Sequence, residues 1–345
     1  MPIRAVASYM PCLAALRGRP YGPAIQKRID AALDPKAVEF ILEPDPEARL
    51  RALETAEVYI CRNEAPPEGL FQRAKKLRLI QAGTPWGERI GMERAAEHGV
   101  AVALYPRPTS QAVADGAMLL LLILARNLPE GDRRIRGSWP GPFSPTRADG
   151  SAYNWTQVQG VQGLTGVRMG ILGMGEIARF VAQRARGFGM DVRYWNRTPL
   201  PKPIERKLGC KPMEREKLLK AAEVLYVGVG MRPDTRHYVG AKELAALPEG
   251  AIVLNLGRGP LVDQEALLAA LDSGRLGGAG LDVFSPEPLP PDHPLLRHPR
   301  VAATPHIGGG DDDNLVRELE GFLANAHRIA AGKRPIGIAN GVKWS

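Results

Sequence analysis

Short apolar or β-branched runs alternate with helix-like segments along most of the chain, a pattern typical of parallel sheets covered by helices. In the first third of the chain, these runs predict strands at 3–8, 38–42, 58–61, 77–81 and 100–103. From residue 167 onward, they predict strands at 167–172, 191–195, 224–229, 251–256, 279–283 and 300–303. Each set is large enough to form an open sheet. The predicted fold class is therefore α/β, with two doubly wound parallel-sheet domains.

The segment between the two sets of strands sets the first domain boundary. A proline-rich stretch leads to Thr109 and Ser110, either of which is a good N-cap for the long apolar helix that follows. A second helical segment, 313–331, follows the last predicted strand, and we expect the chain to return there to the first domain. The predicted domains are 1–106 with 306–345, and an inserted domain at 107–305.

The composition excludes several classes of protein. Hydrophobic residues make up 44% and charged residues 24% of the 345 residues, which is ordinary for a globular protein and unlike a disordered one. The longest apolar run, 117–125, is shorter than the roughly 20 residues that cross a bilayer. The first residues do not resemble a secretory signal peptide. We expect a globular cytoplasmic protein without a membrane partner.

Cysteine usage and net charge narrow the choice of partners. Cys12, Cys61 and Cys210 are few and scattered, so they predict neither a disulfide framework nor a metal site. The net charge of +9 would suit nucleic acid or anionic small molecules. Basic pairs such as Lys75-Lys76 lack interleaved aromatic side chains, which disfavours nucleic acid. A small-molecule partner is therefore expected.

A glycine-rich turn, "GMGEIA" at 173–178, lies between a predicted strand and a predicted helix. Gly173 allows a tight turn, Gly175 lets backbone amides approach a pyrophosphate, and Ala178 is small enough for close packing of helix on strand. The candidate cofactor-binding residues here are Gly173, Met174, Gly175, Glu176 and Ile177. This context favours a Rossmann-like nicotinamide site, and the alternative is a purely structural turn.

The next strand ends in "YWNRTP", where a dinucleotide-binding fold usually places an acidic residue on the adenosine ribose. Asn196, Arg197 and Thr198 stand there instead. Without a carboxylate, nothing in the triplet repels a 2′-phosphate, and Arg197 offers a planar donor fork that suits phosphate. The triplet therefore admits NADP and favours it over NAD. Stacking of Arg197 on the adenine would serve NAD equally well.

Three later segments each place one charged or titratable residue in a loop after a predicted strand, at the sheet edge where such folds bind ligands. They are Arg258 in "NLGRG", Glu287 in "SPEPL" and His306 in "TPH". An arginine can hold a carboxylate and polarise a carbonyl, and a histidine can give or take an alcohol proton. A glutamate beside the histidine fixes the ring and stabilises its protonated form. Each residue alone also fits a structural role.

The GxGxxA turn followed by "NLGRG", "LDVF", "SPEPL" and "TPH" resembles the D-isomer-specific 2-hydroxyacid dehydrogenases over almost the whole chain. The resemblance implies a substrate domain built from both chain ends, an inserted nicotinamide domain and an active site in a central cleft. It implies that Arg258 binds the 2-oxo acid, that Glu287 pairs with His306, and that His306 is the acid–base catalyst. Asp282 would lie near the nicotinamide carboxamide. A homodimer is also implied, with residues 137–166 as an extended arm.

Two segments depart from the family pattern. The family's substrate-carboxylate loop reads glycine, small residue, glycine, whereas here Pro85 follows Gly83 and Thr84 and has no amide hydrogen. Gly83 and Thr84 remain substrate-binding candidates through their amides. In "YVGVGMRPDTR", Gly230 is expected to let the backbone line the cofactor, and Arg232 is a candidate contact for an anionic cofactor or substrate.

The predicted activity is NAD(P)-dependent interconversion of a small 2-oxo acid, such as glyoxylate or hydroxypyruvate, and its D-2-hydroxy acid. Two alternatives remain open at this point. One is a nucleotide-sensing binding protein, like the transcriptional corepressors that resemble this family. The other is an NAD-linked dehydrogenase of a bulkier 2-hydroxy acid.

Overall fold

The chain forms two compact units. The computed structural model describes residues 2–8, 10–16, 20–138, 141, 149–151, 153–310 and 312–344. Unit 1 consists of Met1–Gln111 and Gly309–Ser345, and unit 2 of Ala112–Gly308. The sequence places the two crossings at 106/107 and 305/306, so both lie a few residues further along the chain than expected.

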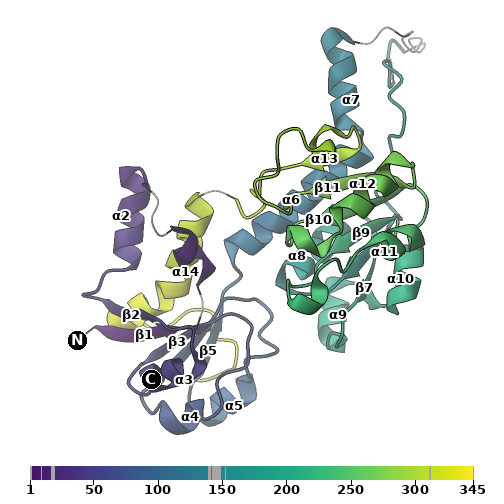
Figure 1. The fold of residues 1–345 in the computed structure, drawn as a ribbon. Coiled ribbons are helices and arrows are strands. Elements are labelled where there is room, and N and C mark those ends of the chain that lie inside the picture. The colour runs from purple at the N-terminus through teal and green to yellow at the C-terminus, as the bar shows by residue number, and fades with distance from the viewer. Residues whose placement is uncertain are drawn as a thin grey trace. The chain divides into compact units, whose positions relative to one another are not determined.

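Unit 1 contains a five-stranded, fully parallel sheet in the order β2-β1-β3-β4-β5 (Figure 1). Its strands are β1 Ile3–Ala7, β2 Val38–Leu42, β3 Val58–Cys61, β4 Leu79–Ala82 and β5 Ala101–Leu104. In register, Ile3 lies opposite Val38 and Ala5 opposite Val58. This order is that of the flavodoxin-like doubly wound fold.

Helices from both ends of the chain cover the sheet of unit 1. They are α1 Pro11–Leu16, α2 Pro23–Ala32, α3 Pro46–Leu53, α4 Leu70–Arg73, α5 Met92–Glu97 and α14 Asp312–Ala330. On α14, Val316, Leu319 and Leu323 are buried at helical spacing, and they share one apolar cluster with Ala5 and Ala7 of β1. The core of unit 1 therefore depends on α14, which follows the whole of unit 2 in the sequence.

Unit 2 contains a seven-stranded parallel sheet in the order β12-β11-β10-β9-β6-β7-β8 (Figure 1). Its strands are β6 Arg168–Leu172, β7 Asp191–Trp195, β8 Lys211–Pro212, β9 Val224–Val227, β10 Ala251–Asn255, β11 Leu276–Leu281 and β12 Val301–Ala303. Every residue of β9 and β10 is buried, as expected for central strands covered on both faces. The order is the Rossmann order with one added strand, so the predicted fold class is confirmed.

The helices of unit 2 begin with α6, whose first residues belong to unit 1. They are α6 Pro108–Ala125, α7 Leu128–Arg133, α8 Glu176–Gly187, α9 Lys202–Leu208, α10 Arg215–Ala221, α11 Ala241–Ala246, α12 Gln264–Asp272 and α13 Pro294–Arg297. Short helical turns are η1 Arg134–Ser138, η2 Pro233–Thr235 and η3 Gly259–Leu261. The expected long helix therefore begins at Pro108, before the two predicted caps, because proline is tolerated in a first turn.

Helix α6 is the one described helix that is long and apolar enough to cross a membrane by length and composition. One face of it packs on strand β11, where glycines permit a close approach. A Cβ atom at Gly280 would lie 2.9 Å from Cβ of Leu120, and one at Gly278 would lie 3.0 Å from a methyl group of Leu124. The apolarity of α6 is thus used in packing, although Leu119 remains 52% exposed.

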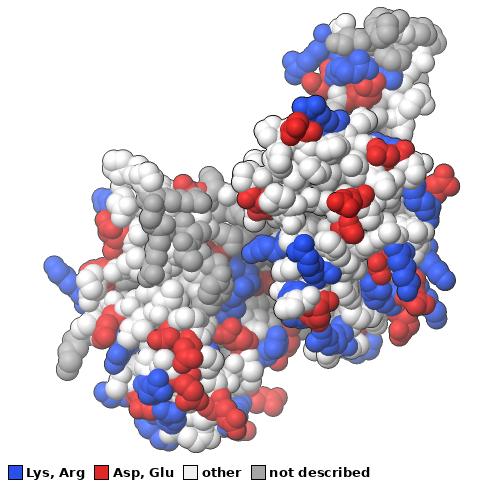
Figure 2. Space-filling view, in the orientation of Figure 1, with Lys and Arg blue, Asp and Glu red and all other residues white. Residues whose placement is uncertain are grey.

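Charged side chains of both signs are interspersed over the face shown in Figure 2. Many of the basic residues are balanced locally, as in the ion pair between Arg168 and Asp191 at 3.0 Å and that between Arg184 and Asp115 at 2.6 Å. The basic residues visible on this face are therefore mixed with acidic ones.

Most strands were predicted within a few residues. One strand was missed: β8 has two residues, one of them proline, and forms no apolar run. The expected arm at 137–166 lies partly outside the described residues, at 139–140, 142–148 and 152. Of its described part, the beginning belongs to η1, and the segment from 153 to 166 contains no helix or strand.

Candidate active site

The glycine-rich turn connects β6 to α8 at the point where the strand order of unit 2 reverses, between β6 and β9. Gly173 has φ +88°, and a Cβ atom there would lie 2.7 Å from the amide nitrogen of Val229. A Cβ atom at Gly228 would lie 2.4 Å from the carbonyl oxygen of Gly173 and 3.1 Å from Cβ of Ala178. The two loops and the start of α8 are therefore packed as closely as backbone allows.

The N-terminus of α8 is shaped to receive an anion. Gly175 is the N-cap residue, is exposed and makes no side-chain cap, so the first amides of the twelve-residue helix point outward. A Cβ atom at Gly230, in the loop after β9, would meet no atom within 4 Å. Because backbone amides, the helix dipole and open space combine here, these residues fit the pyrophosphate of a dinucleotide. Glu176 and Ile177 begin the helix and are half-buried.

The triplet after β7 is tied to this turn by Asn196. Its Oδ1 accepts a hydrogen bond from the amide of Met174 at 3.3 Å, and its Nδ2 donates to the carbonyl of Thr198 at 2.7 Å. Arg197 and Thr198 are exposed. Arg197 lies 3.4 Å from the carboxylate of Asp234, a contact between distant loops that the sequence pattern did not predict.

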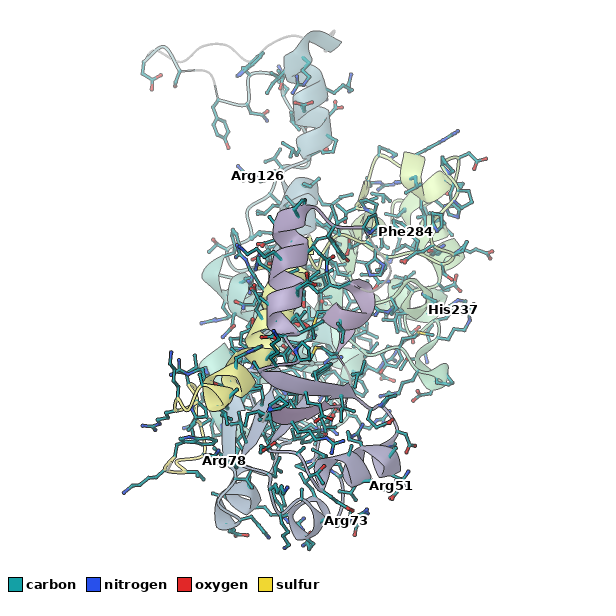
Figure 3. All side chains as sticks on the ribbon, turned by 90° about the vertical axis from the view of Figure 1, so that its left-hand side faces the viewer. Arg51, Arg73, Arg78, Arg126, His237 and Phe284 are labelled. Atoms are coloured by element: carbon teal, nitrogen blue, oxygen red, sulfur yellow. The ribbon has the colours of Figure 1, made fainter. Side chains whose placement is uncertain are left out.

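Arg258 follows β10 in a loop that packs against the next one. Asn255, at the end of β10, donates to the carbonyl of Arg258 at 3.0 Å, and the exposed guanidinium donates to the carbonyl of Gly257 at 2.7 Å. A Cβ atom at Gly259 would lie 1.8 Å from the carbonyl oxygen of Phe284, which Figure 3 labels. Only glycine permits this contact, which joins the loop of Arg258 to the loop of Glu287.

Glu287 and His306 form a direct pair. Nδ1 of His306 lies 2.8 Å from Oε2 of Glu287, while Oε1 accepts from the amide of Phe284 at 2.8 Å. Burial raises the pKa of the Glu287 carboxyl, but the Phe284 amide, the His306 ring and the charge of Arg258 together hold that pKa below its usual value. The carboxylate thus stays ionised beside the ring, and Nε2 of His306 is the nitrogen that Glu287 does not use.

Asp282 holds the loop that carries His306. Its carboxylate is 2% exposed and accepts hydrogen bonds from the hydroxyl of Thr304 at 2.7 Å and the amides of Ile307 and Gly308, each at 2.9 Å. These bonds fix the segment on either side of His306, whose φ is +56°. The sequence suggested a cofactor contact for Asp282 but did not predict this anchoring.

The predicted substrate-binding loop lies in unit 1, and its amides are used within that unit. Gly83 donates to the carbonyl of Cys61 at 2.8 Å, and Thr84 donates to that of Ala82 at 2.9 Å. Thr84 is fully buried. In this structure both amides thus donate to carbonyl groups of unit 1, and the role of Gly83 and Thr84 in substrate binding stays a prediction.

The other histidines of unit 2 have local roles. Nδ1 of His293 accepts from the amide of Leu295 at the start of α13, and Nδ1 of His298 accepts from the amide of Arg300. His237, labelled in Figure 3, lies 3.7 Å from the carboxylate of Asp263. Within the part of the chain that the structure describes, no group of three or more His, Cys, Asp and Glu side chains could hold a metal ion.

Comparison with known proteins identifies the family. Residues 118–308 match the family model described as "D-isomer specific 2-hydroxyacid dehydrogenase, NAD binding domain". A glyoxylate reductase of Korarchaeum cryptofilum is 34% identical over 79% of this chain and 78% of its own length. A glyoxylate/hydroxypyruvate reductase B of Yersinia enterocolitica is 33% identical over 87% of this chain and 92% of its own.

One solved structure is similar to this chain over nearly its whole length. The crystal structure of a glyoxylate reductase from Paecilomyes thermophila superposes with a TM-score of 0.58 and 26% sequence identity. The match covers 97% of each chain. The similarity therefore includes both units and is not confined to the nucleotide-binding fold.

Proposed function

This chain belongs to the D-isomer specific 2-hydroxyacid dehydrogenase family and is a dehydrogenase acting on a CH–OH group, and from that premise we propose that it reduces a small 2-oxo acid to its D-2-hydroxy acid. The substrate class proposed is that of glyoxylate and hydroxypyruvate, the acids named for the two curated relatives. The observation that carries the proposal is the 2.8 Å hydrogen bond between His306 and Glu287.

In this mechanism Arg258 binds the substrate carboxylate and polarises the ketone. His306 donates a proton from Nε2 to the carbonyl oxygen, and Glu287, bonded to Nδ1, keeps the ring oriented and stabilises its charge. A nicotinamide cofactor held in unit 2 would supply the hydride. Asp282 acts at a distance, because its three hydrogen bonds hold the loop on which His306 stands.

We extend the proposal to the cofactor and assign NADP as the preferred one. Asn196 replaces the usual acidic residue, so no carboxylate of the triplet opposes a 2′-phosphate. Arg197 is exposed and can present its donors to that phosphate, and Thr198 adds a hydroxyl. The contact of Arg197 with Asp234 must then open when the cofactor binds.

A homodimer and a cytoplasmic location complete the proposal. Leu119, Leu128 and Ile135 of α6, α7 and η1 are each more than half exposed, which is unusual for large apolar side chains so near in sequence, and a second copy would cover them. The three cysteines are free thiols, as expected in a reducing compartment. Sedimentation analysis and cell fractionation test these two points.

A screen of 2-oxo acids of increasing size against NADPH and NADH tests the whole proposal. We expect oxidation of NADPH with glyoxylate or hydroxypyruvate and a higher kcat/KM for NADPH than for NADH. Reduction of bulkier acids with NADH alone would instead support the alternative of an NAD-linked dehydrogenase. Binding of cofactor without turnover of any acid would overturn the reductase and revive the nucleotide-sensing alternative.

A further inference from the structure

One carboxylate joins two arginines from separate loops of unit 2. Asp234, in η2 after β9, lies between Arg232 of the same loop and Arg197 of the loop after β7. Oδ1 of Asp234 accepts from Nε of Arg232 at 3.0 Å, and Oδ2 lies 3.4 Å from a terminal nitrogen of Arg197. Each arginine therefore uses a different oxygen of the same side chain.

These ion pairs contribute little to the free energy of unfolding. The side chains of Arg197, Arg232 and Asp234 are 72%, 51% and 61% exposed. Exposed pairs of this kind contribute about 0–1 kcal/mol, because solvent screens the charges and the long side chains lose entropy. Two guanidiniums gathered at one exposed carboxylate therefore point to a function in binding an anion.

Both arginines stand on loops whose backbone is tied to residues of the candidate cofactor site. Thr235 is 2% exposed, and its hydroxyl accepts from the amide of Arg232 at 2.7 Å and donates to the carbonyl of Gly230 at 2.9 Å. On the other side, Asn196 binds the amide of Met174. The backbone of each arginine is thus held relative to the glycines that would line a dinucleotide.

We propose that Arg232 and Arg197 together bind the 2′-phosphate of NADP, and that Asp234 is an internal anion which the phosphate displaces. This inference rests on the NADP preference proposed above and adds its second arginine and its competitor. A phosphate carries more charge and more acceptor oxygens than a carboxylate, and both guanidiniums can bind it through paired donors. NAD has no group that would displace Asp234, so the cofactor with the phosphate is favoured.

Isothermal titration of the full chain with adenosine 2′,5′-bisphosphate and with AMP tests the proposal without catalysis. The unmodified protein should bind the bisphosphate more tightly. Arg232→Ala should weaken bisphosphate binding about tenfold, the effect of losing one charged hydrogen bond, and leave AMP binding unchanged. Arg206→Ala is the matched control, because Arg206 is an exposed arginine of α9 in the same unit. It should change neither affinity.

Asp234→Asn tests the displaced anion. The hydrogen bond from Arg232 and the charge of Arg197 lower the pKa of Asp234, so the carboxylate is ionised throughout the neutral range. The neutral variant should bind the bisphosphate more tightly than the unmodified protein and bind AMP equally well. Weaker bisphosphate binding by Asp234→Asn would overturn the displacement.

Failure of this inference can be told from failure of the NADP preference. If the unmodified protein binds AMP and the bisphosphate equally, the preference itself is wrong, and this inference falls with it. If the protein prefers the bisphosphate and Arg232→Ala keeps that preference, only the role of Arg232 is wrong. Equal loss of both ligands in Arg232→Ala would assign the arginine to the adenine and would also overturn the proposal.

Discussion

Both sheets are parallel and doubly wound, but the residues at the point where the strand order reverses differ between them. In unit 2 the order reverses between β6 and β9, and the loops there carry Gly173 and Gly228, whose backbones touch. In unit 1 it reverses between β1 and β3, and the chain after β1 places Met10 and Cys12 there, both fully buried. Parallel sheets bind ligands at this position, and in unit 2 the exposed N-cap residue Gly175 leaves the first amides of α8 available there.

Each unit also contains a pair of oppositely charged or titratable side chains, and the two pairs differ in their exposure to solvent. In unit 2, Glu287 and His306 are partly exposed and face each other at 2.8 Å. In unit 1, Arg107 and Glu318 lie 3.5 Å apart and are 6% and 1% exposed. Burial, followed by the charge of Glu318, raises the pKa of the nearby Cys12 thiol, which disfavours its nucleophilic thiolate form. A shared fold therefore does not make the two edges equivalent, since only the accessible pair can exchange a proton with a ligand.

The largest expected effect is the loss of activity when the exposed pair of Glu287 and His306 is broken. His306→Asn should lower kcat by about 10²–10⁴-fold, because the proton donor is removed. Asparagine is chosen because it tolerates the positive φ of His306. His237→Asn is the matched control, since His237 also has a positive φ and also faces a carboxylate. Steady-state kinetics measure both variants, and a His306→Asn enzyme with normal kcat would remove this residue from the chemistry.

The buried pair of unit 1 should matter for folding and not for proton transfer. Glu318→Leu removes the carboxylate that pairs with the buried Arg107 guanidinium. This should cost about 3–5 kcal/mol in the free energy of unfolding. Arg107→Met combined with Glu318→Leu should recover most of the loss, because no charge is then buried. Urea unfolding of the single and double variants measures the difference. A single variant as stable as the parent would show that the pair is dispensable.

A substitution at the contact of Gly173 in unit 2 should lower the free energy of unfolding by less, but it should weaken cofactor binding as well. Gly173→Ala adds a methyl group against the backbone of Val229 at a positive φ, with an expected loss of about 2 kcal/mol or more in stability. Gly250→Ala is the control, because Gly250 also has a positive φ but has open space around its Cβ position. Only Gly173→Ala should weaken NADPH binding, as followed by cofactor fluorescence. Equal effects of the two variants would show that the backbone angle alone matters.

The smallest effect concerns pH. The pKa of Glu287 is lower in the folded chain than in the unfolded one, so its contribution to stability is fully present above the unfolded value, about 4.3, and is lost as the pH falls through the lower folded value. Solvent screens this partly exposed carboxyl, so the contribution should not exceed about 1 kcal/mol. The difference in unfolding free energy between the parent and Glu287→Gln, measured by urea unfolding at a series of acidic pH values, should shrink as the pH falls below about 4.3. A difference that does not shrink while the carboxyl is being protonated would contradict the pair.

The sequence pattern was sufficient for the sheets and for the motifs within single loops. Alternating apolar runs predicted the long strands, and the glycine turn, Arg258, Glu287 and His306 all stand in loops after strands, as expected. The pattern failed where a role depends on contacts between distant segments. Nothing near Glu318 shows that it will meet Arg107, and nothing near Asp282 shows that its carboxylate will be used by the backbone of the loop after β12.

The substrate loop shows a different limit. Sequence spacing can show that Gly83 and Thr84 follow a strand, but it cannot show which way their amides point. Phe322 of α14 packs where a Cβ atom of Gly83 would be, and both amides bind nearby carbonyls. This arrangement depends on a helix from the other end of the chain, so no local pattern could have predicted it.

That dependence also sets an order of events during synthesis. Strands β1 to β5 leave the ribosome before any of unit 2, but the side chains of α14, which cover part of one face of their sheet, are made after unit 2. Unit 2 can therefore complete its core while unit 1 still exposes Ala5 and Ala7 of β1. The N-terminal segment of the nascent chain would then be accessible to a chaperone or a protease. A chain stalled before Asp312 should be cut by a protease in its first hundred or so residues and resist cutting in unit 2, and the opposite result would show that unit 1 does not wait for α14.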